Sequence, residues 1–142
     1  MKISAILATK GKNVVTIHPD QSIGDAIALL SEHNIGALMV VDAADKPVGI
    51  LSERDIVRHA VKNREIFSLA VSQLMTKNIV TGSPHDDLNA ILETMTDRHF
   101  RHMPILDGGK LIGIVSIGDL VKAQLNEYKG EIDNLQTRMS KG

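Results

Sequence analysis

The 142-residue chain contains no cysteine and no tryptophan, and only one tyrosine and two phenylalanines. Without cysteine it can form no disulfide bond, no thiolate zinc site and no cysteine nucleophile. An aromatic content of 2% leaves almost no side chains on which the bases of a single-stranded nucleic acid could stack. The formal net charge of -1 provides no long-range attraction toward DNA or an acidic membrane. We therefore expect no nucleic-acid partner.

Long apolar runs are missing as well. The longest, Ala37 to Val41, is too short to cross a bilayer. The apolar part of the stretch from Met1 to Leu7 is too short for a signal peptide. These absences predict a soluble cytoplasmic protein without membrane contact, and the hydrophobic fraction of 43% is sufficient for a real core.

The chain contains an internal duplication. A shift of 65 residues superimposes identical residues early in each half, and a shift of 64 does so after a turn that is one residue shorter in the second half. The first shift pairs Lys12, Asn13, Val15, Thr16 and Pro19 with Lys77, Asn78, Val80, Thr81 and Pro84. The second pairs Lys46, Gly49, Ser52 and Asp55 with Lys110, Gly113, Ser116 and Asp119. Near each start, Ile6-Leu7 corresponds to Leu74-Met75, with a three-residue gap absorbed by Thr9-Lys10-Gly11.

Each repeat predicts the same order of elements: helix, strand, helix, hairpin, helix. The expected ranges are helices at about 2–8 and 68–75, strands at 14–17 and 79–81, amphipathic helices with apolar faces at 23–30 and 88–95, and hairpin strands at 37–41, 48–51, 102–106 and 111–115. The fold class is α/β (α+β), with two pseudo-symmetric units that each have a small, mainly antiparallel sheet and helices on one side. Because a unit of about 60 residues buries too little surface alone, we expect the units to pack sheet to sheet. The expected boundaries are unit 1 at 1–62, a linker at 63–67, unit 2 at 68–125 and a C-terminal helical extension at 126–142.

A seven-residue stretch ends each repeat, from Gly49 to Asp55 and from Gly113 to Asp119. In both, two apolar strand residues precede a serine, an aspartate follows three positions later, and an apolar helical run comes next. Serine can cap that helix, and the helix dipole favours the aspartate in the first turn. Capping would suffice to explain one copy. Two copies at matching positions indicate a further role.

The paired Gly-Ile-Leu-Ser-x-x-Asp and Gly-Ile-Val-Ser-x-x-Asp stretches, together with Arg101-His102-Met103-Pro104-Ile105, resemble a tandem pair of CBS domains (a Bateman module) over roughly residues 1–125. The chain is similar to small stand-alone bacterial members of that family. The resemblance implies a regulatory module, not an enzyme, that binds an adenosine-containing ligand between its two units. AMP is the first expectation, with ADP, ATP, NAD(H) or S-adenosylmethionine as further possibilities. It also implies a homodimer and an effector protein, which the sequence does not identify, that reads the signal.

The resemblance assigns residues to each part of such a ligand. The ribose would contact Asp119, Asp55, Ser116 and Ser52, since a carboxylate can accept hydrogen bonds from both sugar hydroxyls. The phosphate would contact Arg98, Arg101, His102, Arg54 and Arg58. The adenine pocket would comprise Asn78, Ile79, Thr81, Met103, Pro104, Thr16, Gly36 and Ala37.

We expect each base to lie between strands of one repeat. In the second repeat the walls would be Asn78 to Thr81 and Met103-Pro104, beside Asp119; in the first they would be Asn13 to Thr16 and Gly36 to Leu38. Arg98 and Arg101 have no arginine counterparts in the first repeat. This asymmetry predicts that the second-unit site binds a phosphorylated adenosine more tightly than the first-unit site.

The same residues allow other interpretations. The charged run at 97–102 is also typical of a solvated face. His99 and His102 have no third ligand at a suitable spacing, so we expect no metal site. No nucleophile elbow or paired-carboxylate arrangement is present, which argues against an enzyme. Alternatively, the chain is a structural or oligomerisation protein with an empty cleft, and its function depends on the tail helix.

An apolar stripe follows the second repeat. Its members are spaced by four and three residues, as in a heptad: Val121, Leu125, Tyr128, Ile132, Leu135 and Met139. The spacing predicts a long helix that packs either on the protein's own body or against another chain.

Overall fold

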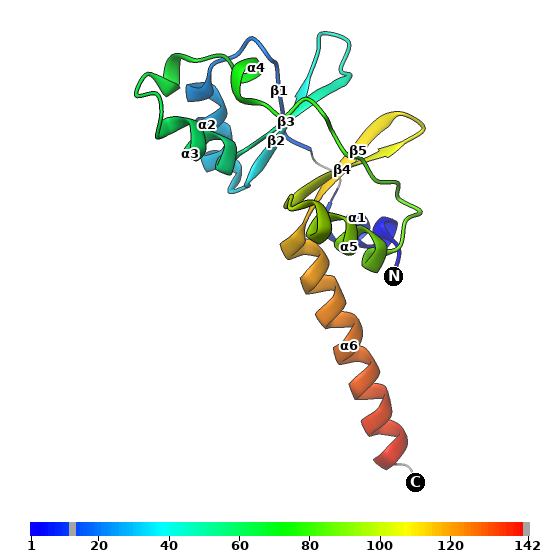
Figure 1. The fold of residues 1–142 in the computed structure, drawn as a ribbon. Helices are drawn as coiled ribbons and strands as arrows, with labels where there is room; N and C mark the ends of the chain where they lie inside the picture. The colour runs from blue at the N-terminus through cyan, green and yellow to red at the C-terminus, as the bar shows by residue number, and fades with distance from the viewer. Residues whose placement is uncertain (12–13, 141–142) are drawn as a thin grey trace.

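The structure, a computed structural model, describes residues 1–11 and 14–140, which form two α/β units and a long C-terminal helix (Figure 1). The first part of the chain contains α1 (Ile3–Lys10), β1 (Thr16–Ile17), α2 (Ile23–His33), β2 (Ala37–Val41), β3 (Pro47–Ser52) and α3 (Glu53–Ala60). The second contains the 3-10 helix η1 (Ile66–Ser68), α4 (Val71–Leu74), α5 (Leu88–Arg98), β4 (His102–Asp107), β5 (Lys110–Ser116) and α6 (Ile117–Ser140). The predicted α/β fold class with small sheets and helices is confirmed.

The two sheets are related by the repeat. In the first, β2 lies between β1, to which it is parallel, and β3, to which it is antiparallel. In the second, β4 and β5 form an antiparallel pair. The hairpins have matching registers, because Ala37 lies opposite Ser52 and His102 lies opposite Ser116. Each closing serine is therefore placed beside the first residue of its hairpin.

The strand expected at 79–81 does not form, and that prediction was wrong. The chain meets β4 only through a single parallel bridge between Gly82 and Ile105. In the first unit the backbone N–H of Met39 donates to the carbonyl of Val15 at 3.3 Å. The counterpart of Met39 is Pro104, which has no N–H to donate. Proline therefore removes the bond that would hold residue 80 against the sheet.

The leading segment of each repeat packs into the core of the other repeat. The side chains of α1 join the second core, with Ile3, Ile6 and Leu7 all buried against α5, β4, β5 and α6. The expected helix at 68–75 is broken into η1 and α4, and both pack in the first core through Ile66, Val71 and Leu74. The two units are thus held together by crossed segments of chain.

The crossing explains the glycine that begins each repeated motif. A Cβ added at Gly113 would lie 2.6 Å from Leu7 Cδ2, and one added at Gly49 would lie 2.6 Å from Met75 Sδ. Real Cβ atoms do not approach other atoms so closely, so a side chain at either position would force the end of Leu7 or Met75 to shift, and at Gly49 it would also lie 3.1 Å from the carbonyl oxygen of Thr76. This is a packing reason for the residue, independent of any ligand.

The helix α6 begins in the second unit and continues well beyond it (Figure 1). Leu120 is fully buried in the second core, whereas the apolar residues of the later turns are exposed. None of the helices in the described part of the chain is long and apolar enough to cross a membrane.

Candidate functional site

Each repeated motif forms a capping box at the end of a hairpin. At the junction of β3 and α3, Ser52 Oγ accepts a hydrogen bond from the backbone N–H of Asp55 at 3.2 Å. Asp55 Oδ2 accepts in return from the backbone N–H and the hydroxyl of Ser52, both at 3.0 Å. Within the described chain, no hydrogen bond reaches Oδ1 of Asp55, so one carboxylate oxygen is left for a ligand.

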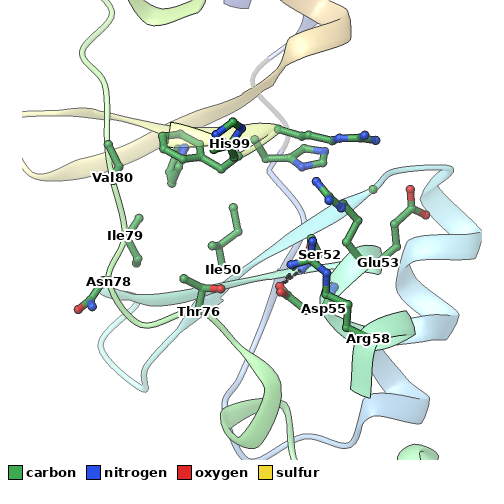
Figure 2. Close-up of a pocket in the computed structure, with 16 residues that line it drawn as sticks. Ile50, Ser52, Glu53, Asp55, Arg58, Thr76, Asn78, Ile79, Val80 and His99 are labelled. Carbon is green, nitrogen blue, oxygen red and sulfur yellow. Dashed lines mark hydrogen bonds between the residues drawn. The ribbon is translucent and has the colours of Figure 1, made fainter. Parts of the chain in front are cut away.

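Asp55 lies in a cleft between the two units, which we call the Asp55 cleft. Its first-unit wall consists of Gly36, Ile50, Ser52, Glu53, Arg54, Asp55 and Arg58, and its second-unit wall consists of Thr76, Asn78, Ile79, Val80, His99, Phe100, Arg101, His102 and Pro104. Figure 2 shows Ser52, Asp55 and Arg58 on one side and the segment carrying Ile79 and Val80 across from them, with His99 above. The residues of β3 and β4 thus face one another across this cleft.

The Asp55 cleft is rich in unpaired cationic groups. Arg54, Arg58 and Arg101 line it, and none of them forms an ion pair with an acidic residue in the described ranges 1–11 and 14–140. Guanidinium groups bind phosphate through paired, charge-assisted hydrogen bonds. A carboxylate with a free oxygen and three free arginines therefore border the same space.

Asp119 lies in a second cleft, which we call the Asp119 cleft. Its residues are Lys10, Gly11, Val14, Val15, Asn34, Ile35, Gly36, Ala37, His102, Gly113, Ile114, Ser116 and Asp119. The capping box is the same, because Ser116 Oγ accepts from the N–H of Asp119 at 3.0 Å and Asp119 Oδ2 accepts from the N–H of Ser116 at 2.9 Å. No arginine lines this cleft in the described chain.

Lys10 distinguishes the two clefts. Its ammonium group lies 2.6 Å from Asp119 Oδ2 and 2.7 Å from the carbonyl oxygen of Ile114. Burial would raise the pKa of the Asp119 carboxyl, but the hydrogen bonds from Lys10 and from the N–H of Ser116 outweigh it and hold the pKa below its usual range. In the Asp55 cleft the equivalent carbonyl, that of Ile50, instead accepts from the backbone N–H of Thr76 at 2.9 Å.

His102 and Gly36 lie between the clefts and line both of them. Burial lowers the pKa of the His102 imidazole, and the ammonium of Lys10 lowers it further. The carboxylates of Glu53 and Asp119 raise it only in part. His102 is therefore the titratable group that is shared by the two clefts.

The expected pairing of walls and aspartates is wrong. Asn78, Ile79 and Pro104 lie in the cleft of Asp55, not in that of Asp119, and Ala37 lies with Asp119. The crossed leading segments cause the exchange, because residues 76–80 run past β3 of the first unit, where Thr76 bridges Ile50.

The same crossing removes the reason for expecting tighter nucleotide binding at the second-unit site, the site of Asp119. Arg101 faces Asp55, whereas the Asp119 cleft receives only Lys10 and His102 as basic residues among those described. Lys10 was missed from the sequence. Its signal was the insertion Thr9-Lys10-Gly11, which is present only in the first repeat.

Four further candidates lie outside both clefts. Arg98 is exposed at the end of α5, and Thr81 is exposed beside the bridge at Gly82. Met103 is 1% exposed in the second core, and Thr16 lies beside the hairpin turns. Lys12 and Asn13, the start of the expected first-repeat wall, lie outside the described residues. The described chain contains no group of three or more residues that could hold a metal ion.

Comparison with known proteins identifies the class to which this arrangement belongs. A family model for the CBS domain matches residues 4–62 and again residues 71–126. The chain therefore belongs to the CBS-domain family and contains a tandem pair of these domains, as the resemblance predicted.

Individual relatives agree with this assignment. The chain is 41% identical to an uncharacterized 17.7 kDa protein of Acidianus ambivalens, over 89% of this chain and 75% of the relative. The crystal structure of the CBS-domain containing protein ATU1752 from Agrobacterium tumefaciens superimposes with a TM-score of 0.84 at 41% identity, covering 87% of this chain and 92% of that one. The CBS domain pair of protein MJ0100, solved in complex with 5-methylthioadenosine and S-adenosyl-L-methionine, superimposes with a TM-score of 0.79 at 25% identity, covering 89% and 98%.

Proposed function

We propose that this protein is a regulatory module that binds an adenosine-containing nucleotide, with the Asp55 cleft as its primary site. The carrying observation is the combination of a carboxylate with a free oxygen and three unpaired arginines in one cleft. The 5-methylthioadenosine and S-adenosyl-L-methionine in complex with the MJ0100 domain pair support the choice of ligand class. AMP is the proposed ligand, because the three arginines can bind its phosphate through charge-assisted hydrogen bonds.

The proposed binding mode follows from the chemistry of the lining residues. The ribose hydroxyls donate to Oδ1 of Asp55, since Oδ2 is already used by Ser52. The phosphate is bound by Arg54, Arg58 and Arg101. The flat faces of the adenine base pack between Ile50 on β3 and Ile79 on the opposite segment, both of which line the cleft (Figure 2).

In this proposal the Asp119 cleft is the weaker site. There the Lys10 ammonium already neutralises the carboxylate through Oδ2, so a ribose hydroxyl that donates to Oδ1 gains a weaker charge-assisted hydrogen bond. No arginine of the described chain is available in that cleft to compensate. The proposed order of affinity is therefore the reverse of the order expected from the sequence.

Ligand binding in the Asp55 cleft would carry a signal because both units supply its walls. A nucleotide there favours the arrangement in which the two walls are closest, and it can shift a population only by binding one arrangement better than another. We propose that an effector protein, not yet identified, reads this shift.

Calorimetric titration with AMP tests the proposal on the wild type and three variants. Asp55→Asn should weaken the main binding event by at least about tenfold, the loss of one or more charge-assisted hydrogen bonds. Asp119→Asn, the matched control at the repeat-related position, should leave it almost unchanged. Lys10→Met should add a second binding event. Equal losses in the two aspartate variants would contradict the ranking.

Thermal melting extends the test to the other candidate ligands. AMP, ADP, ATP, NADH and S-adenosylmethionine would each be added in turn, and a ligand at 100 times its dissociation constant adds about 2.7 kcal/mol to the free energy of unfolding. If none of them changes the melting temperature, the nucleotide proposal is wrong and the structural alternative stands.

A further inference from the structure

The apolar stripe of α6 is uncovered in the structure. The exposed fraction is 61% for Leu125, 51% for Tyr128, 54% for Ile132, 56% for Leu135 and 79% for Met139. The sequence left open whether this stripe packs on the protein's own body or against another chain. The structure shows that it does not pack on the protein's own body. Large apolar side chains in a continuous exposed row are typical of an interaction surface.

The stripe has the geometry of a coiled-coil seam. Placing Leu125, Ile132 and Met139 at heptad position a puts Tyr128 and Leu135 at position d, with no polar residue in either set. Gly130, the weakest helix former in this region, then falls at position f on the opposite side of the helix. A Cβ added there would meet nothing within 4 Å, in agreement with an outward-facing position.

We propose that the stripe binds the same stripe of a second copy of this chain, with the two helices antiparallel. In an antiparallel pair, position a of one helix packs against position d of the other, and positions g face each other across the seam. When Ile132 packs against Leu135 of the second copy, Glu131 at position g lies alongside Arg138 at position g of that copy. The two-fold symmetry of the pair forms this contact between opposite charges twice.

A parallel pair offers no such complementarity. Position g of one helix then faces position e of the other, which places Gln124 beside Lys129 and Glu131 beside Gln136. Each of these contacts joins one charged and one neutral side chain. Charge therefore selects the antiparallel arrangement, while the apolar seam supplies the affinity in either case.

Light scattering over a range of protein concentrations tests the association on the intact chain. The wild type should behave as a dimer, and Leu135→Asp should be monomeric because a buried carboxylate would face the seam. Asn134→Asp is the matched control, since its exposed neighbouring position points away from the seam and the dimer should persist. Helicity measured by circular dichroism shows whether each variant retains α6. A monomeric wild type, or a dimer that survives Leu135→Asp, overturns the proposal.

Charge reversal tests the orientation. Glu131→Arg and Arg138→Glu should each raise the dimer dissociation constant by about tenfold, because two attractive contacts become repulsive. The double variant should restore the wild-type value. Absence of cysteine from the chain allows a second test, in which Ile132→Cys and Leu135→Cys proteins are mixed. Crosslinks between the two different variants support the antiparallel pair, and efficient crosslinking of each variant to itself overturns it.

Discussion

At the scale of single residues, His102 is the group through which pH would act on ligand binding. It lines both clefts and faces the side chains of Lys10, Arg101, Glu53 and Asp119. Burial, the largest cause, holds the pKa of this imidazole below the usual value of histidine in the free protein. A phosphate placed beside the imidazole stabilises its protonated form and raises that pKa. The complex then binds more protons than the free protein does.

This linkage predicts that AMP binding by the wild type strengthens relative to that by His102→Gln as the pH falls from about 7.5 toward 5.5, through the usual pKa of histidine. His102→Gln should flatten the change, because the glutamine cannot titrate. AMP also gains a proton near pH 6, but that contribution is common to both proteins and cancels in the comparison. Titration calorimetry in two buffers of different ionisation enthalpy measures the proton uptake. Identical pH profiles for the two proteins would mean that His102 does not face the phosphate.

At the scale of elements, the serine that caps α3 has two roles that can be separated. Ser52 caps α3, and Ser22 caps α2 in the same manner, with Ser22 Oγ accepting from the N–H of Asp25 at 3.0 Å. Of these two serines, Ser52 alone also donates to an aspartate of a cleft, through its backbone N–H and its hydroxyl to Asp55 Oδ2. The two caps are therefore a matched pair that differ in their relation to the site.

Ser52→Ala and Ser22→Ala should each lower the free energy of unfolding by about 1 kcal/mol, the usual cost of losing a helix cap. Only Ser52→Ala should also weaken AMP binding, because Asp55 loses one of the contacts that orient it. Denaturant unfolding and calorimetry on the same preparations measure the two effects. Equal AMP affinities in both variants would mean that Ser52 acts only as a helix cap and does not contribute to ligand binding.

The elements that the sequence predicted correctly depend on local signals. The capping boxes, the hairpins and α2 follow from serine placement, turn residues and helical spacing within a few residues. The missed features depend on partners distant in the chain. The strand at 79–81 fails because of Pro104 on another strand, and the role of Lys10 requires knowing that α1 reaches Asp119. Residue spacing within a single element does not contain either fact.

At the scale of the whole molecule, the crossed leading segments make the two units depend on each other. Residues 76–80 supply part of the wall of the Asp55 cleft as they run past β3, and α1 delivers Lys10 to the Asp119 cleft. The sequence duplication therefore does not divide the protein into two independent cores. Each core contains buried side chains from both repeats.

This arrangement predicts a crossed effect of two core mutations. Leu7, 2% exposed, belongs to the first repeat but packs in the second core, and Leu74, 4% exposed, belongs to the second repeat but packs in the first core. Leu7→Ala should destabilise mainly residues 88–120, and Leu74→Ala mainly residues 16–56. Each cavity should cost about 2–5 kcal/mol.

Hydrogen exchange followed by mass spectrometry distinguishes the outcomes, because it reports local opening segment by segment. Faster exchange in the repeat that contains the mutation would contradict the crossed packing. Equal acceleration in both regions would mean that the protein opens only as a single cooperative body. The crossed pattern would instead show that each core depends on the leading segment of the other repeat, as the packing of Leu7 and Leu74 indicates.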